Sequence, residues 1–201
     1  ETFDRHCVIL GNVNTNSPLL VDKVVTQAAE VYCGAGQGLI AVPFILSGAM
    51  GPVTTAAAIA QALAEAMIVG AYTQLVRPGA PFILGNFLSS MNLRSGAPTF
   101  GMPEPLMSNL VIGQLARRLK LPLRCGGALT ASKLADFQAA AESADSMLST
   151  VLGGASLGGK ARLGFGQQPD LGLVACGLGG AARQYFFIGD RQPLAGGGVI
   201  Q

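Results

Sequence analysis

Short apolar runs alternate with longer, helix-like segments along the first 157 residues. Each run ends in a loop of polar residues and glycine, and the segment after it has apolar side chains spaced three and four apart, as on one face of a helix. Short apolar runs bounded by such loops are typical of buried strands. We expect strands at residues 6–10, 39–45, 82–84 and 121–125, and the beginning of a fifth at 155–157.

Start and stop signals delimit four helices between these strands. Asp22 is suited to cap the first helix, and Pro103 and Glu104 are suited to the first turn of the third. The helices are expected at residues 22–34, 54–73, 103–120 and 134–152. The expected apolar stripe of the fourth helix consists of Phe137, Ala141, Ala144, Leu148 and Val151.

Repeated strand–loop–helix units predict a parallel sheet with right-handed crossovers. Such a sheet either stays open and doubly wound or closes into a (β/α)8 TIM barrel. Several strands here end in polar loops, whereas a doubly wound fold concentrates its ligand contacts at one glycine-rich turn, and this favours the barrel. We therefore predict an α/β fold in which residues 1–157 form part of a TIM barrel, with four complete units and the start of a fifth.

The character of the chain changes at Gly158. Twelve of the 44 residues from this point are glycine, against 16 in the first 157. This composition leaves little for a packed helix, and residues 158–201 are left unassigned as a glycine-rich tail. The tail is either divergent, disordered or read out of frame.

Composition limits the classes of function. Half of the residues are hydrophobic, 12% are charged and the net charge is +2, with no cluster of Lys and Arg, which argues against nucleic-acid binding. The mean hydropathy of +0.46 raises the question of a membrane. The most apolar helix, at residues 56–71, contains Gln61 and Glu65, so we interpret it as buried in protein. No signal peptide is visible, and a cytoplasmic location is expected.

Few residues in the sequence suit acid–base or metal chemistry. His6 is the only histidine, and the four cysteines form no C-x-x-C pair, so we expect no metal site and assign no catalytic residue. Polar side chains instead follow the predicted strands, where a barrel has its mouth. They indicate a rim that binds and positions a ligand: Asn14, Asn16, Ser47, Asn86, Ser89, Thr130 and Ser132.

Several ordered motifs resemble the trimethylamine:corrinoid methyltransferase superfamily, from about Val8 to Leu157. They are NTNSPL at 14–19, PFILSGAMGPVT at 43–54, QLVRPGAP at 74–81, SGAPTFGMPE at 95–104, GQLARR at 113–118 and GALTASK at 127–133. The resemblance implies a TIM barrel that moves a methyl group from a methylated amine to the cobalt of a corrinoid. The corrinoid is carried by a separate small protein that docks over the barrel mouth.

The resemblance also bears on the substrate. Archaeal members carry pyrrolysine late in the barrel, and many bacterial relatives lack it and are associated with quaternary amines such as glycine betaine. A quaternary amine has a fixed positive charge, which aromatic faces and oxygen atoms bind. Phe44, Phe87 and Phe100, near the ends of predicted strands, are expected to supply the faces. A corrinoid protein and a methylated amine are thus the expected partners, and the chain is a candidate homo-oligomer.

Two other hypotheses remain open from the sequence. Lys133 lies in a loop after a predicted strand, where a lysine can form a Schiff base in a lyase or aldolase. Alternatively, the chain is a truncated barrel without catalytic activity. An array of strands that cannot close exposes apolar edges, so the truncated form should be poorly soluble unless a partner covers them.

Overall fold

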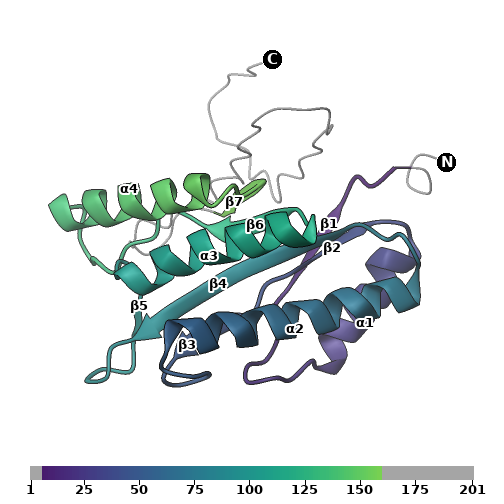
Figure 1. The fold of residues 1–201 in the computed structure, drawn as a ribbon, viewed down its shortest axis with the longest axis horizontal. Helices are drawn as coiled ribbons and strands as arrows, with labels where there is room; N and C mark the ends of the chain where they lie inside the picture. The colour runs from purple at the N-terminus through teal and green to yellow at the C-terminus, as the bar shows by residue number, and fades with distance from the viewer. Residues whose placement is uncertain (1–5, 160–201) are drawn as a thin grey trace, which may run out of the picture.

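The computed structural model describes residues 6–159 and contains, within them, four helices and a seven-stranded sheet. The strands are β1 (Leu10–Val13), β2 (Gly38–Ala41), β3 (Phe44–Ser47), β4 (Phe82–Met91), β5 (Pro98–Thr99), β6 (Leu123–Gly126) and β7 (Leu157–Gly159). The helices are α1 (Lys23–Gly34), α2 (Thr55–Val76), α3 (Pro103–Leu119) and α4 (Phe137–Leu152). Figure 1 shows the helices beside the long central strand β4. From residue 160 on, the predicted tail lies outside the described residues.

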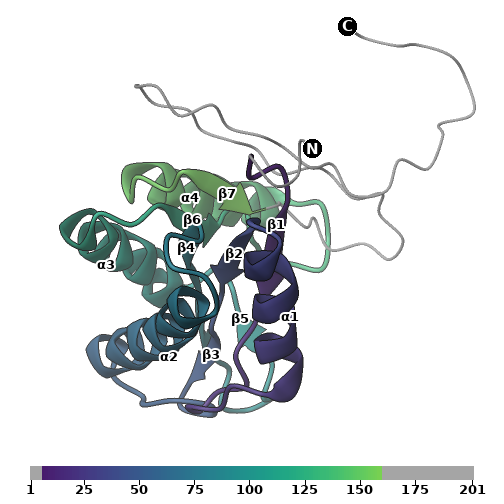
Figure 2. The ribbon, with the colours of Figure 1, turned by 90° about the vertical axis from the view of Figure 1, so that its right-hand side faces the viewer.

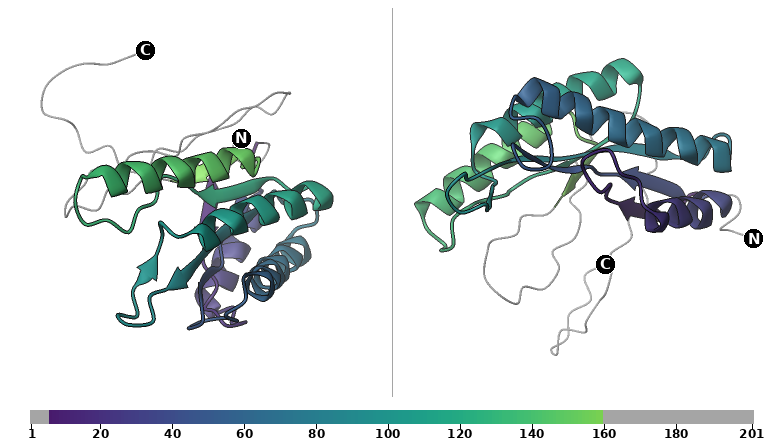
Figure 3. Two further views of the ribbon diagram at one scale, coloured as in Figure 1. Left: turned by 60° about the vertical axis from the view of Figure 1, so that its left-hand side comes forward. Right: turned by 90° about the horizontal axis from the view of Figure 1, so that it is seen from below.

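The main strands follow one another across the sheet in the order β1-β2-β4-β6-β7, and each pair is parallel. Each helix packs against the next one along the chain. Figures 2 and 3 show α1 to α4 following one another around the strands. An order that never reverses has no topological switch point, unlike a doubly wound sheet. The described residues are therefore an α/β unit with a mostly parallel sheet, compatible with part of a barrel.

Small residues bring the second helix close to the sheet. Ala58 and Ala66 of α2 are buried in one cluster with the strand residues Leu39 and Leu84. At Gly70 a Cβ atom would lie 2.9 Å from the ring of Phe82, so a larger residue there would push α2 away from β4. By length and composition alone, α2 is also the one helix of the described residues that could cross a membrane. Here its alanine-lined face forms part of the protein core.

Several strand boundaries differ from the prediction. The predicted strand at 6–10 shares only Leu10 with β1, the one at 121–125 is shifted to Leu123–Gly126, and the one at 155–157 begins at Leu157. Three of the differences have a local reason. The first strand begins at Leu10 because the backbone before it bonds to a side chain. The side-chain oxygen of Gln37 accepts hydrogen bonds from the N–H groups of Val8 and Ile9, so these groups do not pair with a neighbouring strand. The run at 39–45 is divided into β2 and β3 at Pro43, which has no N–H to donate. Both pieces pair with β4. The third boundary, the end of β4, decides the positions of several candidate site residues and is described with the site.

The expected apolar stripe of the last helix is wrong. Phe137 is 88% exposed and Leu148 is exposed, and the buried residues of α4 are Ala139, Ser146, Ser149 and Thr150. Small polar residues face inward because they have hydrogen-bond partners there. The Thr150 hydroxyl donates to the carbonyl of Gly126 at 2.6 Å, so α4 is joined to the end of β6 by polar contacts.

A buried carboxylate holds the loop after β1 against α2. Glu65 is 1% exposed and accepts hydrogen bonds from the hydroxyls of Thr15 (2.5 Å) and Ser17 (2.7 Å), the backbone N–H of Leu19 and the Gln61 amide. Burial alone would raise the pKa of Glu65, but these donors outweigh it, and its pKa lies below the ordinary value. The sequence predicted Glu65 as a buried helix residue and gave no sign of the partners.

We predict that Glu65→Ala lowers the free energy of unfolding by about 3 kcal/mol at pH 7, because several buried donors lose their acceptor. Since the folded-state pKa of Glu65 is depressed, its stabilising contribution is present above the unfolded-state pKa of about 4.3 and is lost as the pH falls through the folded-state value. Glu65→Gln should therefore differ most from the wild type above about pH 5 and least in strong acid. Urea unfolding across this pH range measures both effects.

The exposed Glu30, which accepts a hydrogen bond from Tyr72, provides the matched control. Glu30→Gln should change the free energy of unfolding by less than about 0.5 kcal/mol. Equal losses from the Glu30 and Glu65 replacements would contradict the role assigned to Glu65.

Candidate functional site

The candidate site lies on the face of the sheet opposite the helices, which we call the inner face. Successive side chains of a strand alternate between faces, and Leu84 and Leu123 pack toward the helices. The neighbours Ile40, Val42 and Ile83 form a separate apolar cluster with Leu10 and Phe87. The carboxyl ends of the parallel strands, where barrels bind their ligands, meet at one edge of this face.

Three phenylalanines form a row on the inner face, and we call them the aromatic row. Phe44 of β3 is paired with Phe87 of β4, and their ring centroids are 5.3 Å apart. Phe100, just after β5, is 5.7 Å from Phe87. The interplanar angles of 37° and 49° are tilted arrangements that aromatic pairs favour. All three rings are only half-buried, so part of each remains open to a ligand.

One charged side chain, Arg124 of β6, reaches the aromatic row. Its guanidinium carbon is 5.9 Å from the centroid of Phe87, within the range of a cation–π contact. Arg124 was not among the residues that we predicted for the site. A charged residue inside the apolar run at 121–125 was the signal that could have identified it, because the inward positions of a buried strand are normally apolar.

The predicted polar rim is divided between the two faces because β4 is longer than expected. The strand continues to Met91, so Asn86, Ser89 and Ser90 are strand residues and not part of a polar loop after residue 84, as expected from the sequence. Gly85 and Asn86, which lie just beyond the predicted end of the strand at residue 84, both pair with β6. Ser89 lies on the inner face two positions beyond Phe87, and its hydroxyl donates to the Thr99 carbonyl at 3.2 Å.

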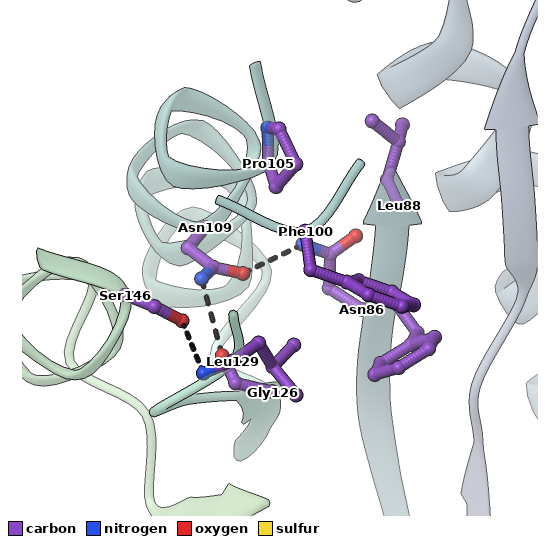
Figure 4. A pocket seen from close by; sticks show the side chains of 9 residues that line it. Asn86, Leu88, Phe100, Pro105, Asn109, Gly126, Leu129 and Ser146 are labelled. Carbon is purple, nitrogen blue, oxygen red and sulfur yellow. Dashed lines mark hydrogen bonds between the residues drawn. The ribbon is translucent and has the colours of Figure 1, made fainter. Parts of the chain in front are cut away.

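Asn86 forms its hydrogen bonds with α3, and it lines a small cavity together with Phe87 and Phe100 of the aromatic row. It is 1% exposed, and its side-chain amide donates to Ser108 at 3.0 Å and to Asn109 at 2.9 Å. Asn109 in turn donates to the Gly126 carbonyl and to Ser149 of α4. Figure 4 shows Asn86 and Asn109 pointing toward each other across a small cavity. The cavity, of about 10 Å³, has room for no more than one water molecule and is too small for a methylated amine.

The remaining polar candidates hold loops or helix ends. Asn16 donates to Asp22, the cap of α1, at 2.5 Å, and Asn14 is exposed on the same segment. The Ser47 hydroxyl is buried at the end of β3 and has no hydrogen-bond partner among residues 6–159. Thr130 donates to Glu142 at 2.8 Å, and the Ser132 hydroxyl contacts Asp136 at 3.0 Å. These contacts tie the loop after β6 to α4.

Hydrogen bonds keep the pKa of Glu142, in α4, low. Burial would raise the pKa of Glu142, but hydrogen bonds from Gln138, Thr130 and the Ala131 backbone bring it below the ordinary value. Lys133, in the same loop, is exposed. A lysine that forms a Schiff base is activated by desolvation or by a neighbouring cation, so the surroundings of Lys133 give no support to the lyase hypothesis.

Comparisons with known proteins agree with the resemblance. The family model of trimethylamine methyltransferase (MTTB) matches residues 1–161. A glycine betaine methyltransferase of Desulfitobacterium hafniense is 32% identical over 147 residues, which are 73% of this chain and 31% of that protein. A proline betaine:corrinoid methyltransferase of Eubacterium limosum is 29% identical over 153 residues, 76% of this chain and 31% of the relative.

A trimethylamine methyltransferase from another strain of Desulfitobacterium hafniense is 30% identical over 149 residues, 73% of this chain and 29% of its own length. The chain thus spans about a third of the length of the curated relatives that it matches. Because the family model covers most of the 201 residues, the chain belongs to the trimethylamine methyltransferase (MTTB) family.

Proposed function

We propose that this chain forms part of a methyltransferase that moves a methyl group from a methylated tertiary or quaternary amine to the cobalt of a corrinoid protein. The aromatic row carries the proposal. A methylated ammonium is a cation with few or no N–H groups, and aromatic faces attract such cations by about 0.5–2 kcal/mol each. Phe44, Phe87 and Phe100 present three half-buried rings on one face, in a chain of a family named for trimethylamine.

The side chains near the aromatic row suit a reaction without proton transfer. In the proposed step the bond between nitrogen and the methyl carbon breaks, the carbon bonds to cobalt and the electron pair remains on nitrogen. The corrinoid, a co-substrate on a separate protein, supplies the nucleophile. The row has to hold the ammonium group, direct one methyl group outward and exclude water. Ser89 and Arg124, its polar neighbours on the inner face, exchange no proton near neutral pH.

The activity itself gives the first test of this function. The 201-residue chain is incubated with a reduced corrinoid protein and with glycine betaine, proline betaine or trimethylamine in turn. We expect methylation of the cobalt with at least one of the three amines. The change in absorbance of the corrinoid measures this methylation. Absence of the signal with all three amines, from chain shown to be folded by circular dichroism, would count against the proposal.

Replacing the central ring tests the aromatic row directly. Phe87→Leu keeps an apolar side chain but removes the ring face, so the affinity for tetramethylammonium should fall between about twofold and thirtyfold, as expected from the strength of one cation–π contact. Titration calorimetry measures the change. Phe137→Leu is the matched control, because Phe137 is 88% exposed on α4. The row has no role in binding if both variants retain the wild-type affinity.

A further inference from the structure

Arg124 is placed on the inner face by the pairing of its strand. Its neighbours Leu123 and Cys125 are buried toward the helices, so the side chain between them points to the other face. In register it stands beside Gly85 of β4 and Leu157 of β7. Its guanidinium reaches the ring of Phe87, one inward position closer to the carboxyl end of the sheet. The arginine therefore extends toward the edge at which a ligand would enter.

The guanidinium has a charge but no anionic partner within the described part of the chain. Among residues 6–159 it lies over the Phe87 ring and forms no hydrogen bond or ion pair. Burial lowers the pKa of Arg124 from its ordinary value, yet an arginine side chain remains protonated in proteins. A partly buried charge without a counter-ion is costly, and a carboxylate matches the planar fork of a guanidinium by accepting two hydrogen bonds.

The two features of the inner face are complementary to the two ends of one class of ligand. The aromatic row attracts a methylated ammonium group, and Arg124 attracts an anion beside the same central ring. A betaine joins a quaternary ammonium to a carboxylate through a single carbon atom. Building on the methyl transfer proposed above, we infer that Arg124 binds the carboxylate of the substrate and makes the site selective for betaines over methylated amines that lack a carboxylate.

The charge of Arg124 should affect the binding of two kinds of ligand differently. A guanidinium attracts a carboxylate, but it repels a bare quaternary ammonium held on the same ring. Removal of its charge should therefore weaken the binding of glycine betaine and leave unchanged or strengthen the binding of choline. Choline is the matched probe, because it carries the same trimethylammonium group and has a hydroxyl in place of the carboxylate.

The experiment measures dissociation constants of the full chain for glycine betaine and choline by titration calorimetry, with folding checked by circular dichroism. The wild type should prefer glycine betaine. Arg124→Met keeps the apolar stem, and it should weaken glycine betaine binding at least about thirtyfold, in the range for loss of one partner of a buried charge pair. Arg124→Lys, which keeps the charge but not the fork, should lose less. Arg118→Met, at an exposed position of α3, should behave as the wild type.

The contrary outcomes show whether the role assigned to Arg124 or the proposed methyl transfer is wrong. If the wild type binds both ligands equally, or if Arg124→Met keeps the wild-type preference, Arg124 does not bind the carboxylate, and the proposed methyl transfer stands. If the wild type binds neither ligand, the proposed function of this chain fails and the inference fails with it. Should Arg124→Met not fold, the Lys variant and the ligand preference of the wild type decide the question.

Discussion

The pairing of β4 is the constraint on which the rest of the structure depends. This one strand pairs with β2 and β3 on one side and with β6 on the other. Because side chains alternate along it, the pairing sends Leu84 and Asn86 toward the helices, and Ile83 and Phe87 to the inner face. A slip by one residue would exchange the two sets, burying the aromatic ring against α3 and exposing the amide. The candidate site is therefore defined by strand register before any loop contributes to it.

Polar side chains on the helix side fix the segments at the strand ends. Glu65 holds the loop after β1, Asn109 joins β4, β6 and α4, and Glu142 holds the loop after β6. Each hub is a buried or half-buried group with several partners, which makes its geometry specific and its loss costly. Beside the apolar cluster of Ile40, Val42 and Ile83, the described part of the inner face carries aromatic rings, small polar groups and one arginine. A division of this kind lets a rigid outer layer position a site that needs few ionisable groups.

The sequence predicted the order of the four helices and of the parallel strands between them, and the start of three helices, because caps, first-turn prolines and glycine stops are local signals. The short antiparallel strand β5 has no counterpart in the prediction. Asp22 does accept a hydrogen bond from Val25, and α3 does begin at Pro103. The sequence did not predict equally well which side chains of β4 and α4 point toward the core. Glycine at position 85 looked like the end of a strand, but it pairs with β6, and the polar residues after it were assigned to a loop. The predicted apolar stripe of α4 is wrong because hydroxyl groups with hydrogen-bond partners on β6 and α3 replace apolar contacts there. Which polar groups bind one another across the layers depends on tertiary contacts that no local pattern contains.

The two parts of the proposed site would act differently during the reaction. As the methyl group leaves a quaternary ammonium, the positive charge on nitrogen disappears, so the attraction of the aromatic row weakens toward the transition state. Binding of that kind favours the substrate and does not by itself accelerate the transfer. The carboxylate of a betaine keeps its charge throughout, so a contact with Arg124 holds the molecule equally well before and after the step. The contact between the carboxylate and Arg124 would then keep the nitrogen–carbon bond aligned with cobalt. The loss of charge on nitrogen would weaken the contact between the product and the aromatic row.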